Sequence, residues 1–109
     1  MKILFVEDEP DLQKVIQLSL DYMKDINYEI AGSAEKAIEF LKNNPVDVIV
    51  SDHYLPKMTG VDLLVHVKEK HPNIMRFLLT GSVENDVFDA AQEYPVRVYS
   101  VPGSLNGLT

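Results

Sequence analysis

Acidic and hydroxyl side chains stand directly after three separate apolar runs of the chain. Four such residues follow these runs: Glu7 and Asp8 after residues 3–6, Asp52 after residues 46–51, and Thr80 after residues 77–79. If the runs are neighbouring parallel strands, their carboxyl ends meet at one edge of a sheet. Open α/β sheets bind ligands at that edge. We therefore expect the four side chains to share one pocket.

The three carboxylates of this set define the chemistry that the pocket could perform. Two carboxylates about 4 Å apart repel by about 4 kcal/mol at an effective dielectric of about 20, and a cation between them removes that cost. Oxygen-only ligands suit Mg2+. A carboxylate whose charge is neutralised nearby can attack phosphorus. The residues predict a site for a divalent cation and for phosphoryl transfer, with Asp52 as the nucleophile.

The elements that must position these residues are five short apolar runs separated by segments of helical periodicity. The runs cover residues 3–6, 28–31, 46–51, 74–79 and 96–101. The intervening segments, in which apolar residues recur every three or four positions, cover 12–23, 34–41, 63–67 and 83–93. Pro10 suits the first turn of a helix, and Ser33 suits a helix N-cap. This alternation is typical of a doubly wound parallel α/β sheet of order 2-1-3-4-5, in which the first and third strands are neighbours.

The length and the C-terminal tail bear on domain organisation. The 109 residues predict a single domain over 1–109. Only residues 102–109 follow the fifth run, and two of them are glycines, which makes a poor helix. We therefore expect the last helix of the fold to be missing and the chain to be the N-terminal part of a longer protein.

Composition excludes several classes of function. The formal net charge of -7 would repel nucleic acid phosphates, so we expect no direct nucleic acid binding. The absence of cysteine excludes disulfides and thiolate metal sites. No apolar run approaches the roughly 20 residues of a membrane span, and Glu7 interrupts the start too early for a signal peptide. These features predict a soluble, cytoplasmic protein.

Three segments of the chain resemble the receiver domains of two-component response regulators. They cover residues 3–10, 48–60 and 76–81. The second is the most specific, because an aspartate followed by a Leu-Pro-x-Met-x-Gly loop is hard to find elsewhere. The resemblance extends over residues 1 to about 102 and implies a flavodoxin-like receiver fold.

The resemblance also implies roles for the acidic residues. Asp52 would be the phosphoacceptor and would share Mg2+ with Asp8 and the backbone carbonyl of Tyr54. Glu7 would act on the same ion through water. A magnesium-dependent hydrolase is disfavoured, because such enzymes commonly need a second acid two residues after the nucleophile, where this chain has Tyr54. A flavin or nucleotide carrier is disfavoured because no glycine-rich loop follows the first run.

The C-terminal part of the resemblance contains the main departure from the family. Thr80 would be the switch hydroxyl and Tyr99 its aromatic partner, although counting back from Pro102 puts Val98 in that place. Receiver domains normally carry a lysine at the end of the fifth strand, just before a proline. Here that position falls on Val101, or on Pro102 when counted from Thr80, and neither is basic. The missing ammonium predicts slower phosphotransfer, weaker coupling, or the loss of both.

Two functions follow from the resemblance. The first is a phosphorelay receiver that accepts a phosphoryl group on Asp52 from a sensor histidine kinase or phosphotransfer protein, and then controls an output domain or protein. Such a chain would not be an enzyme beyond self-catalysed phosphotransfer and slow autodephosphorylation, and it could form a homodimer. The alternative is a degenerate receiver that binds proteins independently of phosphorylation. His53 directly follows Asp52, where a proton-transfer role is conceivable, but we expect it to be a surface loop residue beside the pocket.

Overall fold

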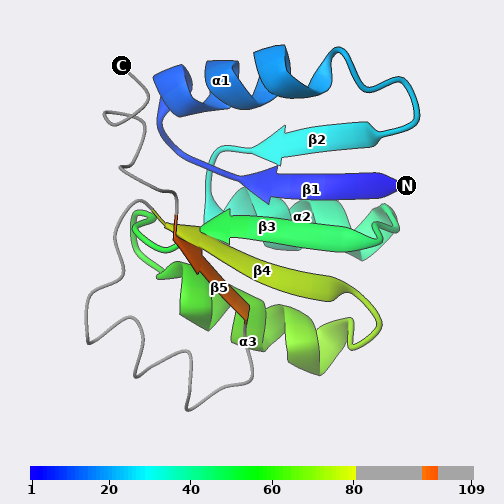
Figure 1. Ribbon diagram of the computed structural model, residues 1–109. Coiled ribbons are helices and arrows are strands. Elements are labelled where there is room, and N and C mark those ends of the chain that lie inside the picture. Colours follow the sequence, from blue (N-terminus) through cyan, green and yellow to red (C-terminus); the bar gives the residue numbers. More distant parts are fainter. Residues whose placement is uncertain (81–96, 101–109) are drawn as a thin grey trace.

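The computed structural model describes residues 1–80 and 97–100, which form a five-stranded parallel sheet of order β2-β1-β3-β4-β5 (Figure 1). Its strands are β1 (Lys2–Val6), β2 (Asn27–Ala31), β3 (Val48–Asp52), β4 (Met75–Thr80) and β5 (Arg97–Ser100). The helices among the described residues are α1 (Pro10–Leu20), α2 (Ala34–Asn43) and α3 (Gly60–Lys70). The predicted fold class and strand order are confirmed. The helix expected at 83–93 and the tail after the fifth strand lie outside the described residues.

The third strand begins two residues later than its apolar run indicates. Val46 is buried but lies outside β3. The N–H of Asp47 donates to the carbonyl of Lys2 at 2.9 Å, and the carbonyl of Asp47 accepts the N–H of Met75 at 3.0 Å. Asp52, expected to follow the strand, is instead its last residue. Its backbone is therefore held by the sheet.

Side-chain caps start two of the helices. The hydroxyl of Ser33 accepts the N–H of Lys36, as the N-cap prediction requires, and the hydroxyl of Thr59 accepts the N–H of Asp62. No side chain caps α1, although Pro10 occupies its first turn as predicted. α1 ends at Leu20, so the apolar pattern that extended the helix to position 23 overestimates its length.

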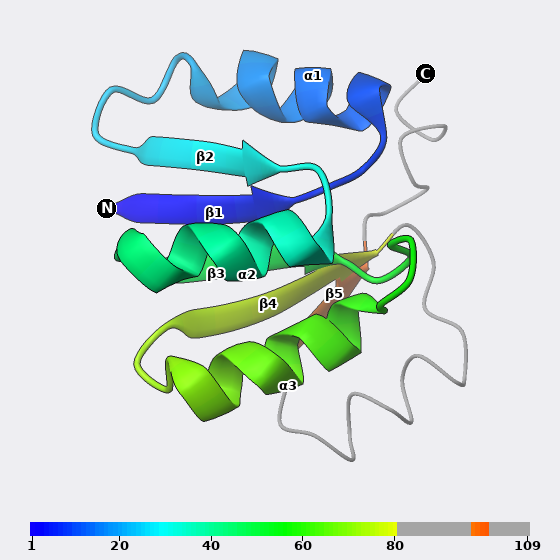
Figure 2. The same ribbon diagram turned by 180° about the vertical axis from the view of Figure 1, so that it is seen from behind.

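The core lies between the sheet and the helices α2 and α3, which cross the same face of the sheet (Figure 2). Leu4, Ile49 and Leu78 point into this layer from β1, β3 and β4 and are fully buried. Leu63 and Leu64 of α3 meet them and are also fully buried. Full burial of such side chains is worth about 1.5–3 kcal/mol each, so this layer supplies much of the stability.

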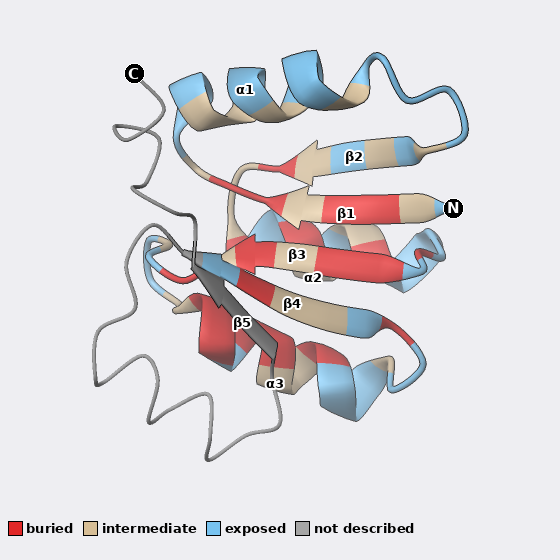
Figure 3. Ribbon diagram, in the orientation of Figure 1, coloured by how far each residue is buried: buried red, intermediate tan, exposed pale blue. Residues whose placement is uncertain are grey.

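The opposite face of the sheet is covered less completely. A row made by Phe5, Val50 and Phe77, which are register partners on β1, β3 and β4, is half-buried. α1 lies alongside β2, away from α2 and α3, and none of its residues is buried (Figure 3). Right-handed crossovers account for this placement, because β2 and β3 lie on opposite sides of β1.

Candidate metal and phosphoryl-transfer site

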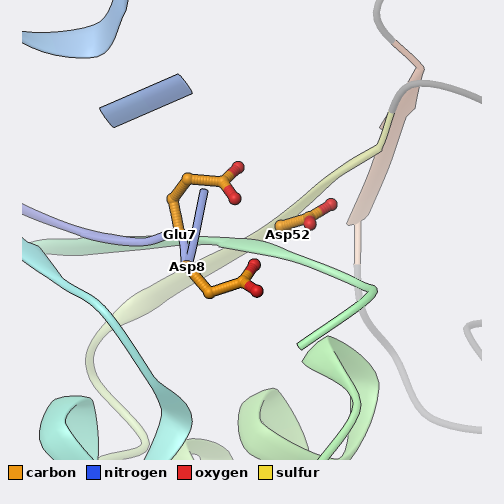
Figure 4. Close-up of side chains that lie close together, drawn as sticks. All are labelled: Glu7, Asp8 and Asp52. Carbon is orange, nitrogen blue, oxygen red and sulfur yellow. The ribbon is translucent and has the colours of Figure 1, made fainter. Parts of the chain in front are cut away.

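The strand register brings the predicted acidic residues together. Val6 of β1 pairs with Ser51 of β3, so Glu7 continues β1 at the level of Asp52. Carboxylate oxygens of Glu7, Asp8 and Asp52 all lie within 4.8 Å of one another (Figure 4). Glu7 is buried, whereas Asp8 and Asp52 are half-buried. The three acidic residues expected at the carboxyl edge of the sheet thus lie together, whereas the side chain of Thr80 lies outside what the structure describes.

Burial and mutual repulsion act on the charge of Glu7. Burial raises the pKa of its carboxyl from the ordinary value of 4.5 to about 7, and the negative charges of Asp52 and Asp8 act in the same direction. The N–H of Glu9 donates to this carboxylate at 3.1 Å and partly opposes the rise. Ionisation of Glu7 in the folded protein therefore costs free energy.

Burial and charge repulsion also oppose ionisation of Asp52. Burial raises the pKa of its carboxyl above 3.8, and the charge of Asp8 adds to the rise. Hydrogen bonds from the backbone N–H groups of His53 and Tyr54 favour the ionised form and lower the pKa in opposition. Both shifted carboxyls belong to the same cluster, which is a frequent property of functional sites.

The loop after Asp52 is fixed tightly against α3. The carbonyl of His53 accepts the N–H of Leu55 at 3.1 Å and the N–H of Gly60 at 2.8 Å. A side chain at Gly60 would collide with the carbonyl oxygen of Asp52 and would lie 2.8 Å from Cα of His53 and 2.7 Å from Cδ1 of Leu78. Only glycine permits this approach. The sequence marks Gly60 as a turn residue, but the structure shows that it starts α3 and fixes the backbone at the acceptor.

His53 is not at the surface, so that expectation is wrong. Its side chain is buried, with the ring edge packed against the ring of Tyr54 at a centroid distance of 5.0 Å. Within the part of the chain that the structure describes, its Nδ1 atom has no hydrogen-bond partner. The polar residue type favoured an exposed position, but continuation of the β3 alternation beyond Ser51 turns this side chain inward.

The donor set fits a hard divalent cation. All three side chains offer carboxylate oxygens, and their separation is within the span that one ion can bridge. The raised pKa values of Glu7 and Asp52 reflect unfavourable ionisation that an ion would relieve. No histidine or cysteine of the described residues belongs to the cluster, so a thiolate or imidazole metal site is not indicated there. The arrangement can hold an ion beside Asp52, which is the requirement for attack of its carboxylate on phosphorus.

The remaining predicted site residues lie on β4, on β5 and beyond. Thr80 follows Leu79, the register partner of Asp52, and therefore ends β4 at the carboxyl edge of the sheet. Tyr99 pairs with Leu79 one position before that edge. Val101 and Pro102, where a lysine was expected, lie outside the described residues. Arg97, the nearest cation in that stretch, begins β5, three residues before the partner of Thr80. At about 3.3 Å per residue its backbone lies about 10 Å from the edge.

Sequence comparisons identify the family and several relatives of the chain. The family model of the response regulator receiver domain matches residues 3–99. The response regulator protein PilR of Pseudomonas aeruginosa is 31% identical over 79% of this chain and 20% of its own length. The hydrogenase transcriptional regulatory protein HoxA of Cupriavidus necator is 32% identical over 89% of this chain and 20% of its own length. The chain thus spans about a fifth of the length of these two relatives.

Solved structures show the same architecture. The signal receiver domain of an HD domain-containing protein from Pseudomonas fluorescens superimposes with a TM-score of 0.85 at 28% identity, covering 98% of this chain and 86% of that one. Among the described residues, no helix is long and apolar enough to cross a membrane. The family match, the strand order and the acidic cluster agree, and the chain belongs to the response regulator receiver domains.

Proposed function

We propose that this receiver domain accepts a phosphoryl group on Asp52 from a sensor histidine kinase or a phosphotransfer protein and changes conformation to control an output. The observation that carries the proposal is the acidic cluster, in which carboxylate oxygens of Glu7, Asp8 and Asp52 lie within 4.8 Å of one another. Asp52 ends the strand β3 at the edge where parallel sheets bind ligands. As the target of an ATP-consuming kinase, the domain would act in the cytoplasm.

In this proposal, Asp8, Asp52 and the backbone carbonyl of Tyr54 hold Mg2+, and Glu7 acts on it through water. The bound ion would supply charge neutralisation for the carboxylates and the incoming phosphoryl oxygens. An ionised oxygen of Asp52 attacks phosphorus, the bond from phosphorus to the donor's imidazole nitrogen breaks, and the acceptor becomes an acyl phosphate. Raised pKa values of Glu7 and Asp52 oppose ionisation until a cation binds. The domain is a phosphoacceptor, and its own chemistry extends to self-catalysed transfer and slow autodephosphorylation.

The switch would depend on Thr80 and Tyr99 at the ends of β4 and β5. The hydroxyl of Thr80 would move towards the phosphoryl group, and the ring of Tyr99 would follow it. Phosphorylation would then shift an equilibrium between two conformations, by no more than the differential contacts of the phosphoryl group allow. The controlled output would be a domain or protein that lies outside the 109 residues, and a homodimer would be compatible with this role.

The proposal is tested by incubating the protein with Mg2+ and acetyl phosphate and measuring its intact mass. The expected result is a Mg2+-dependent gain of one phosphoryl group, which is lost in Asp52→Asn and retained in Asp62→Asn. Asp62 is a matched control, because it is an exposed aspartate in the first turn of α3. A gain that persists in Asp52→Asn would contradict the assignment of the acceptor.

A second candidate function is a degenerate receiver that binds proteins independently of phosphorylation. It is favoured by the non-basic residues Val101 and Pro102 and by the position of Arg97, whose backbone pairs with Phe77 well before the carboxyl edge. The same mass measurement separates the two. No phosphoryl gain in a folded protein that binds Mg2+ would favour the interaction module.

A further inference from the structure

Three successive peptide groups around the acid pair are each held by a hydrogen bond. The N–H of Glu7 donates to the carbonyl of Ala31 on β2 at 3.0 Å. The N–H of Glu9 donates to the carboxylate of Glu7 at 3.1 Å. Between these, the carbonyl of Glu7 accepts the side-chain amide of Gln13 at 2.6 Å. The first bond joins two backbone groups, and the second ends on the carboxylate of Glu7 itself. Of the three, the bond to the carbonyl of Glu7 comes from a neutral side chain, that of Gln13.

The bond from Gln13 acts on the peptide group that joins the two acids. The carbonyl of Glu7 and the N–H of Asp8 belong to one rigid plane. When Gln13 fixes the carbonyl, it also fixes the direction in which Asp8 leaves that plane. Because a carbonyl only accepts hydrogen bonds, the nitrogen of the amide must face it. Gln13 therefore helps to determine where the carboxylate of Asp8 lies relative to that of Glu7.

Gln13 is also a specific link between α1 and the pocket. No residue of α1 is fully buried, so apolar packing constrains the position of this helix less than that of α3. The amide nitrogen of Gln13 lies 3.6 Å from the position that a Cβ on Gly32 would occupy, which places it in ordinary contact with the β2–α2 connection. The side chain is half-buried between the two loops and has a defined partner on one of them.

We propose that Gln13 is a positioning residue that preorganises Glu7 and Asp8 for a divalent cation, and thereby strengthens Mg2+ binding. This inference rests on the proposed function, because it assumes that the acidic cluster binds Mg2+. Without the amide, the peptide group between the acids loses its own hydrogen bond and is less well ordered, and cation binding must complete the ordering. The cost of that ordering appears as a weaker affinity, while the fold, which is built mainly on the other face of the sheet, is retained.

The experiment measures the Mg2+ dissociation constant by titration calorimetry and urea unfolding in EDTA, for the wild type and three variants. Gln13→Met keeps the length of the side chain but removes the donor. Gln13→Asn keeps an amide that is one methylene too short to reach. Gln17→Met is the matched control, since Gln17 is an exposed residue one turn further along α1. We expect Gln13→Met and Gln13→Asn to weaken Mg2+ binding about threefold to tenfold, the range of one hydrogen bond, and Gln17→Met to leave it unchanged.

The outcomes separate this inference from the proposed function. If the wild type does not bind Mg2+, the proposed function fails and the inference falls with it. If the wild type binds Mg2+ and both Gln13 variants bind as tightly as Gln17→Met, the proposed function stands and the positioning role is refuted. A purely structural role would lower stability in EDTA and leave the affinity of the folded protein unchanged, which also overturns the inference. Should Gln13→Met fail to unfold cooperatively, Gln13→Asn decides between these results.

Discussion

The two faces of the sheet hold their helices in different ways. On one face, Leu63 and Leu64 of α3 are fully buried against the strands. On the other, Val50 is only half-buried and Leu18 of α1 is 58% exposed. Because burial of apolar area dominates folding stability, the α2–α3 face supplies most of it. The α1 face is packed less tightly, and the amide of Gln13 adds a polar contact between α1 and the residue after β1.

The acidic pocket lies where these two kinds of support meet. Asp52 is attached to the well-packed side, because Gly60 binds the loop that follows it. Glu7 and Asp8 are attached to the weakly packed side, through the amide of Gln13. One half of the site is therefore held by the core and the other half by individual hydrogen bonds. Substitutions on the two sides should differ in whether they change stability or cation affinity.

The largest expected effect is that of Gly60→Ala, which attacks the contact between α3 and the acceptor loop. The added methyl group would collide with the carbonyl of Asp52, so the backbone must move. We expect a loss of about 4 kcal/mol or more in the free energy of unfolding, measured with urea. Gly32→Ala is the matched control, because a Cβ there meets only the amide of Gln13 at 3.6 Å, an ordinary contact. Equal stability of the two variants would show that the loop at Asp52 is not held tightly.

A pair of leucine substitutions tests the difference between the faces directly. Leu64→Ala empties a fully buried position on α3, whereas Leu18→Ala removes the same atoms from an exposed position on α1. We expect Leu64→Ala to cost about 3 kcal/mol and Leu18→Ala less than about 0.5 kcal/mol in urea unfolding. Similar losses in both would mean that α1 contributes as much packing as α3.

The pH dependence of stability tests how strongly folding opposes ionisation of Glu7. The pKa of Glu7 is about 7 in the folded protein and 4.5 ordinarily, so the folded state binds more protons between these values. Stability without metal should therefore fall as pH rises from 5 to 8, and the penalty is absent below pH 4.5 and complete above pH 7. Glu7→Gln removes this term and should be about 1 kcal/mol more stable than the wild type at pH 8 in EDTA, with the gain shrinking towards pH 5.

A gain of constant size across this pH range would contradict that explanation. It would indicate that packing or hydrogen bonding of the amide, and not relief of charge, stabilises Glu7→Gln. Unfolding curves of both proteins at pH 5, 6, 7 and 8 distinguish the two causes.

The smallest expected effect concerns the left-handed backbone at Lys57, in the loop between β3 and α3. Its φ of 69° is unfavourable for a residue with a side chain. Lys57→Gly relieves this strain but also frees the unfolded chain, so we expect a net gain of about 0.5 kcal/mol. Lys68→Gly, in the last turn of α3, is the control and should lose up to about 1 kcal/mol, because glycine is a poor helix former. A loss in Lys57→Gly would show that its side chain supports the loop.

Much of the fold and of the candidate site is predictable from the sequence. The alternation of apolar runs with helical periodicity gives a parallel sheet, and the polar residues at the ends of the runs then converge at one edge. This reasoning places Glu7, Asp8 and Asp52 in one cluster, as the structure has them. It misplaces the start of the third strand, because Val46 is buried by the core although it forms no part of the ladder.

What the sequence by itself determined is the alternation of strands with helices and the kind of chemistry at the carboxyl ends of the strands, since both follow from local patterns. The tertiary structure alone decided that His53 is buried, that the amide of Gln13 donates to the carbonyl of Glu7 and that no residue of α1 is fully buried. The physical reason is that these properties depend on which distant segments approach one another. No periodicity within α1 reveals how much of it the sheet covers, and no spacing indicates that a glutamine will reach a carbonyl six residues earlier.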